Sequence, residues 1–116
     1  MKIINLDHIS ANPILPEVKE AMIQAIQKDY GNPLSQHTLG EQAAEVLDDA
    51  RQSVAELINC HISKEIVFTS GGTESVNHAI KGAAFANAEK GKHIITSNIE
   101  HNSVIKSLRR LKTLGY

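Results

Sequence analysis

The second half of the sequence alternates between short apolar runs and longer segments with helical spacing. Glu65 to Ser70 (EIVFTS) and His93 to Ser97 (HIITS) are typical of buried strands. A helix is predicted after each, over Ser75 to about Lys90, where Gly91 suits the C-terminal cap, and over Asn102 to Leu114. Strand, helix, strand and helix with short links indicate parallel strands in a sheet that helices cover.

The first half is mostly helical. Ile3 to Leu6 is a short β-type run, and a proline-broken loop leads to a helix that begins near Pro16. The turn sequence YGNPLSQHTLG separates it from a second helix, over about Gly40 to Ile58. Two or three strands are too few for a covered parallel sheet. We therefore expect an α/β fold with a mostly parallel sheet and covering helices, present here as the incomplete start of a larger domain.

Composition excludes several classes of function. The net charge of −1 and the 3% aromatic content argue against nucleic-acid binding. No segment has the length of a membrane span or the pattern of a secretory signal, and one cysteine, Cys60, excludes an internal disulfide. No histidine has metal-ligand spacing. A cytoplasmic protein without a metal site is expected.

The stretch SGGTES (70–75) is the first candidate site. Glycines at the end of a parallel strand allow a ligand to approach the backbone, and the amides of the following helix start attract anions, phosphate above all. Thr73 can add a hydroxyl donor. The alternative is that Thr73 only caps the helix. The glycine spacings of a P-loop and of a dinucleotide site are absent.

Histidines follow at two further places. Glu100 and His101 come after the second predicted strand, at the sheet edge that carries SGGTES, where His101 could stack on a planar ligand or carry protons. The alternative is a solvated histidine at a helix start. His37 lies in the turn sequence, and a plain turn is its alternative.

Four stretches together resemble one family. They are LDHISANPILPEV, GNPLSQHTLG, EIVFTSGGTESVNHAIKGAA and GKHIITSNIEHNSV, in the family's order and spacing. The chain resembles the N-terminal part of the cysteine desulfurase branch of the class V aminotransferases, which are fold-type I enzymes that use pyridoxal 5′-phosphate. The resemblance covers essentially the whole chain.

The resemblance implies roles for individual residues. It assigns Gly72 and Thr73 to the cofactor phosphate, and it assigns His101 to stacking on the pyridoxal ring and to proton transfer. Ala11 and Asn12 fall in a loop that approaches the substrate in the family, where Thr-Thr is usual, and His37 matches a position with a supporting role. These three are substrate-loop candidates.

The resemblance also implies a reaction. L-Cysteine is converted to L-alanine, and the sulfur passes as an enzyme persulfide to an acceptor protein such as an iron–sulfur scaffold. The family forms homodimers. In the family, the lysine that joins the cofactor and the persulfide cysteine lie beyond residue 116, so the 116 residues alone are expected to be inactive. The implied organisation is an arm with helices over 1–60 and the start of the cofactor-binding domain over 61–116.

Two other interpretations stay open at this point. One keeps the cofactor and changes the chemistry, as in selenocysteine lyase or another class V aminotransferase. The other is a non-catalytic chain that acts as a binding partner or as half of a split enzyme.

Overall fold

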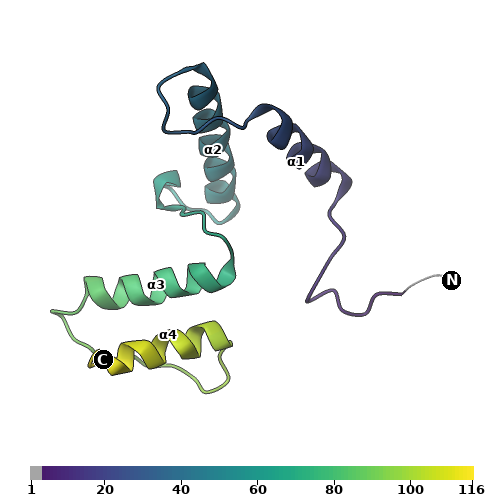
Figure 1. Ribbon diagram of the computed structural model, residues 1–116. Coiled ribbons are helices and arrows are strands. Elements are labelled where there is room, and N and C mark those ends of the chain that lie inside the picture. Colours follow the sequence, from purple (N-terminus) through teal and green to yellow (C-terminus); the bar gives the residue numbers. More distant parts are fainter. Residues whose placement is uncertain (1–3) are drawn as a thin grey trace. The chain divides into compact units, whose positions relative to one another are not determined.

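The computed structural model describes residues 4–116, which form two compact units (Figure 1). One unit extends through Ile66 and the other is Val67–Tyr116. Within the described residues the helices are α1 (Pro16–Lys28), α2 (Thr38–Leu57), the short 3₁₀ helix η1 (Ser63–Glu65), α3 (Gly72–Ala86) and α4 (Asn102–Thr113). No helix among them is long and apolar enough to cross a membrane.

Three of the four predicted α-helices are confirmed, α2 and α4 to within two residues at each end and α1 at its start. Helix α1 begins at Pro16, as predicted, because a proline at the first helical position has no amide that needs a partner. Helices α2 and α4 likewise follow the apolar periodicity that predicted them.

The predicted bounds of α3 were wrong at both ends. The helix begins at Gly72 rather than Ser75, since a first-turn residue needs helical dihedrals but no amide partner, which glycine tolerates. It ends at Ala86, and Asn87 rather than Gly91 is the C-terminal cap. The Asn87 side chain donates to the Ala83 carbonyl at 2.9 Å, which competes with continuation of the helix.

The predicted strands are not formed in residues 4–116. Residues 66–69 and 91–97 have no regular structure, Glu65 belongs to η1, and the predicted run Ile3–Leu6 lies partly outside the described residues. A strand requires hydrogen bonds to a neighbour, and pairs of strands are marginal by themselves. The mostly parallel sheet therefore has no counterpart in this part of the chain.

The first unit is held together by the packing of α2 against η1. Ala55 on α2 is fully buried, and the Arg51 guanidinium donates to the Ile66 carbonyl. After α2 the chain turns at Asn59, which has a φ of 55°, so that the Cys60 amide donates to the Ala55 carbonyl at 2.8 Å. These contacts fix the C-terminal end of α2.

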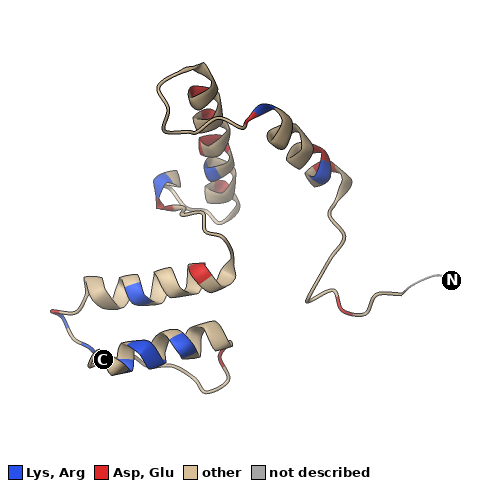
Figure 2. Cartoon of the chain, viewed as in Figure 1, with Lys and Arg blue, Asp and Glu red and all other residues tan. Residues whose placement is uncertain are grey.

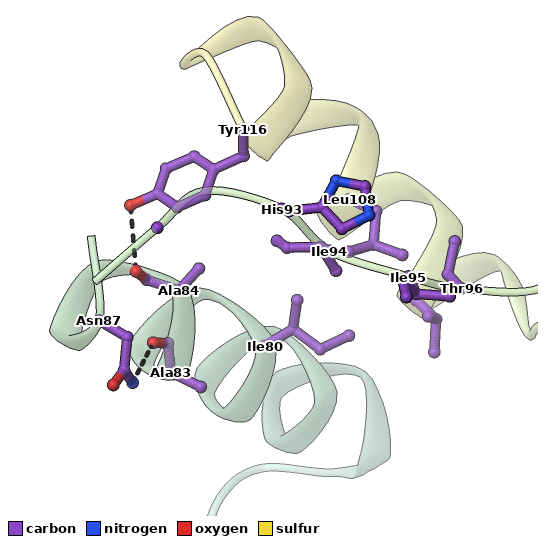
Figure 3. A pocket seen from close by; sticks show the side chains of 12 residues that line it. Ile80, Ala83, Ala84, Asn87, His93, Ile94, Ile95, Thr96, Leu108 and Tyr116 are labelled. Carbon is purple, nitrogen blue, oxygen red and sulfur yellow. Dashed lines mark hydrogen bonds between the residues drawn. The ribbon is translucent and has the colours of Figure 1, made fainter. Parts of the chain in front are cut away.

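In the second unit, α3 and α4 pack side by side and run in the same direction (Figure 1). At their C-terminal ends the Tyr116 hydroxyl donates to the Ala84 carbonyl at 3.1 Å (Figure 3). The rings of Tyr116 and Phe85 meet edge to face, with their centroids 6.2 Å apart. The connecting segment, with His93 to Thr96, lies along the pair and lines a cavity of about 360 Å³ (Figure 3). The first residues of both helices are therefore at the opposite, shared end.

Candidate functional site

The backbone before α3 is held by a network of short polar contacts. The Thr69 hydroxyl donates to the Gly71 carbonyl at 3.1 Å and lies 2.6 Å from the Ser75 hydroxyl. The Glu74 carboxylate accepts from both the amide and the hydroxyl of Ser70, at 2.7 and 2.6 Å. Side chains on both sides of the two glycines thus fix the turn that leads into α3.

The first turn of α3 leaves three amide donors without a partner in the described residues. The first helical bond runs from the Ser75 amide to the Gly71 carbonyl, at 3.1 Å, so the amides of Gly72, Thr73 and Glu74 precede it. A Cβ on Gly71 or Gly72 would meet no atom of residues 4–116 within 4 Å. Free donors and open space together form a cradle for an anion. We call the Gly71–Glu74 backbone the amide cradle.

The capping alternative for Thr73 is wrong. The N-cap of α3 is Gly71, and no side chain makes a capping bond there. Thr73 lies inside the first turn, is exposed, and its hydroxyl has no partner within the structure's described part. The hydroxyl is therefore available to a ligand at the amide cradle.

The two bonds from Ser70 alter the acidity of Glu74. The Ser70 hydroxyl and then the Ser70 amide stabilise the carboxylate and hold the pKa of Glu74 below its ordinary value, with a smaller contribution from His78. The ionised Glu74 carboxylate is thus held by hydrogen bonds from Ser70, beside the amide cradle.

We expect Ser70→Ala to raise the pKa of Glu74 toward its ordinary value, because the largest stabilising bond is removed. Since the folded-state pKa is depressed, the contribution of Glu74 to loop stability is complete above the ordinary pKa and is lost as the pH falls through the lowered value. An NMR titration of the Glu74 carboxyl measures this. Ser53→Ala is the control, because the Ser53 hydroxyl donates to the Asp49 carbonyl. A Glu74 titration that is the same in wild type and Ser70→Ala contradicts the expectation.

His101 is the N-cap of α4. Its Nδ1 accepts from the Ser103 amide at 3.2 Å and lies 2.8 Å from the Ser103 hydroxyl. Because α3 and α4 run in parallel, His101 and the amide cradle lie at the same end of the helix pair (Figure 1). Glu100, beside it, accepts from the Ser97 hydroxyl at 2.8 Å.

His37 is also an N-cap, for α2. Its Nδ1 accepts from the Gly40 amide at 3.3 Å, and its carbonyl accepts from the same amide at 2.8 Å. The loop around it closes tightly, since the backbone of Gly31 meets Leu39 and that of Gly40 meets Ser35 with no room for side chains. His37 is therefore held by the geometry of the loop.

Ala11 and Asn12 lie in a loop tied by local bonds. The Asn5 amide group donates to the Ala11 carbonyl at 3.3 Å. The Asn12 amide group donates to the His8 carbonyl at 2.8 Å, and Asn12 Oδ1 lies 2.6 Å from His8 Nδ1. Sequence reasoning did not single out His8, although its spacing of four residues from Asn12 is a signal for such a contact.

The structure brings part of the predicted site together. Gly72, Thr73 and His101 share the Val67–Tyr116 unit, whereas Ala11, Asn12 and His37 belong to the other unit. Lys and Arg residues occur along α4, and Glu74 is the acidic residue in the first turn of α3 (Figure 2). The described residues contain no group of three side chains suited to a metal ion.

Comparison with known proteins shows which family this chain is similar to. The sequence profile of the family described as aminotransferase class-V matches residues 4–116. The chain is 51% identical over 116 residues to a protein of Shewanella pealeana named cysteine desulfurase IscS, and 45% identical over 113 residues to one of that name from Dictyoglomus turgidum. Each match covers 97% of this chain and 28% of the relative, so the chain spans just over a quarter of their length.

A solved structure of another protein is similar to this chain in fold. The structure of a protein titled NifS-like is similar with a TM-score of 0.86 and 34% sequence identity, over 95% of this chain and 30% of the other. This likeness supports the predicted fold family, although the sheet itself is not formed by the described residues.

Proposed function

The chain belongs to the aminotransferase class-V family, and from that premise we propose that it supplies the phosphate-binding part of a pyridoxal-phosphate-dependent cysteine desulfurase. The full-length enzyme would convert L-cysteine to L-alanine and transfer the sulfur as a persulfide. The relatives named cysteine desulfurase IscS support this substrate.

The observation that carries the proposal is the amide cradle. Three free amides, the Thr73 hydroxyl and the open space at Gly72 suit a group that accepts many hydrogen bonds at once, as phosphate does. The partial positive charge of the helix start adds to the attraction. The residues present therefore fit the phosphate of pyridoxal phosphate.

Under this proposal, different residues of the chain have different roles in binding the cofactor and the substrate. The amides of Gly72 and Thr73 and the Thr73 hydroxyl would hold the phosphate, and His101, at the same end of the helix pair, would lie against the ring and carry a proton. Pyridoxal phosphate, when bound, supplies the electron sink for chemistry at the α-carbon of the amino acid. Ala11, Asn12 and His37 remain the candidates for the loop that approaches the substrate.

Partners follow from the same proposal. We expect a cytoplasmic homodimer that passes sulfur to an acceptor protein such as an iron–sulfur scaffold. A selenocysteine lyase or another class V aminotransferase is the second candidate, and the occurrence of Ala11 and Asn12 where the family has Thr-Thr favours keeping it. A non-catalytic binding partner or split-enzyme half is the third.

We expect the full-length protein that contains this segment to purify with bound pyridoxal phosphate and to release alanine and sulfide from L-cysteine in the presence of a thiol reductant. Amino-acid analysis and a sulfide assay measure the products, and L-selenocysteine in the same assay separates the first two candidates. Protein stripped of its cofactor is the control. A protein that neither retains nor binds pyridoxal phosphate would overturn the proposal and favour the non-catalytic alternative.

A further inference from the structure

The ring of His101 is in contact with two groups of one residue. The Ser103 amide donates to Nδ1 at 3.2 Å, and the Ser103 hydroxyl lies 2.8 Å from the same nitrogen. An amide N–H can only donate a hydrogen bond, so Nδ1 must present a lone pair to it. In the neutral ring the proton is then on Nε2.

Ser103 is itself fixed in place. It is buried on α4, at 7% exposure, and its carbonyl accepts from the hydroxyl of Ser107, which is also buried, at 2.7 Å. Its neighbours on the buried face of the helix are Ser107 and Leu111. The group that orients the exposed His101 ring is therefore part of the packed interior.

The Ser103 hydroxyl also does what its amide cannot. A hydroxyl can donate to a bare Nδ1 and can rotate to accept from an Nδ1 that carries a proton. The amide favours only the first state. Of the two, the hydroxyl is the partner that Nδ1 keeps in both protonation states of the ring.

Two histidines of the other unit have different contacts. His37 has an amide donor from Gly40 at 3.3 Å but no hydroxyl within bonding distance among residues 4–116. His8 has the reverse arrangement, because the Asn12 amide group donates to the His8 carbonyl and thereby directs Asn12 Oδ1 to the ring. An oxygen acceptor requires the proton on Nδ1 of His8. The tautomer is thus determined separately at each position.

We propose that Ser103 is a positioning residue that holds His101 in the Nε2–H tautomer, so that Nε2 is the nitrogen from which His101 exchanges a proton. The reactive nitrogen then projects from a ring anchored at Nδ1 at the start of α4. The tautomer stands on the contacts alone, whereas the proton exchange rests on the proposed function.

The first test reads the ring directly, in full-length protein with ¹⁵N-labelled histidine. NMR of the neutral rings should show Nε2–H for His101 and Nδ1–H for His8 in the same spectrum. Ser103→Pro removes the amide donor in the first turn of α4 without breaking a helical hydrogen bond and should leave His101 as a mixture of tautomers, whereas Ser103→Ala keeps the amide and should keep the Nε2–H form. Ser107→Ala, one turn further along α4, should leave the pattern of wild type. An Nδ1–H ring at His101 in the wild type, a reading that needs no variant, would overturn the proposal. An unchanged ring in a folded Ser103→Pro variant would do the same.

The second test is kinetic. With L-cysteine, Ser103→Pro should lower kcat about tenfold while KM changes little, because complete loss of acid–base assistance costs about a hundredfold or more. Ser107→Ala should keep the kcat of wild type. A kcat equal to that of wild type overturns the role in proton exchange. If the wild-type protein has no desulfurase activity, the proposed function fails, while the NMR result still decides the tautomer.

Discussion

Replacing Gly40 with alanine should destabilise the first unit by about 3 kcal/mol, the upper part of the usual range for overpacking. A Cβ at Gly40 would stand 2.2 Å from the Ser35 carbonyl oxygen and 2.8 Å from that of Asn32. Both obstacles are backbone atoms, and the Ser35 amide is itself bonded to the Asn32 carbonyl at 2.9 Å. The loop cannot yield without losing its own hydrogen bonds. Urea unfolding followed by circular dichroism measures the loss.

Gly82→Ala is the matched control. Gly82 lies in the interior of α3, and a Cβ there meets nothing within 4 Å in the described residues. Alanine favours the helix over glycine by about 0.5–1 kcal/mol, so this variant should be slightly more stable than wild type. Equal urea midpoints for wild type and Gly40→Ala would contradict the prediction, because the loop would then accommodate a Cβ at this position without loss of stability.

Thr73→Ala should weaken the binding of pyridoxal phosphate to the full-length protein by about 1.5–3 kcal/mol, which is roughly a tenfold to 150-fold increase in Kd. The Thr73 hydroxyl is exposed and unpaired among residues 4–116, so its removal breaks no contact within the chain. The Thr73 carbonyl keeps its bond from Asn77, at 2.9 Å. The loss should therefore fall on the ligand alone. Titration of the cofactor-free protein, followed by absorbance, measures it.

Two variants accompany the Thr73 experiment. Thr73→Ser keeps the hydroxyl and should bind the cofactor nearly as wild type does. Thr73→Val replaces the hydroxyl with a methyl group at nearly constant volume and should reproduce the loss seen with alanine. An equal affinity for pyridoxal phosphate in Thr73→Ala and wild type would show that the Thr73 hydroxyl does not contribute to phosphate binding.

Periodicity predicted the helices because their apolar faces repeat at helical spacing. Pro16 marked the start of α1, and α4 begins at Asn102, as predicted. The start of α3 was missed because the same glycines that indicate a turn can also occupy a first helical turn. Sequence reasoning placed strands over 65–70 and 93–97 because apolar runs indicate burial, but hydrogen bonding to neighbours decides whether a strand forms.

The candidate site was predictable by residue type and not by contact. The glycines, Thr73 and His101 were identified from the sequence together with a family resemblance, and their roles remain proposals. The role of Ser103 as partner of Nδ1 was not visible in the sequence, because a serine two residues after a histidine has many possible conformations. The same holds for Gly40, since its crowding by Ser35 arises only when the loop has closed.

The parallel packing of α3 and α4 has an electrostatic consequence. Each helix start carries roughly half a positive elementary charge, and two such ends side by side repel each other, whereas antiparallel neighbours attract. An anion bound at the shared end would relieve this mutual repulsion in addition to making its own hydrogen bonds. Ligand binding and the close packing of the two helices would therefore favour each other.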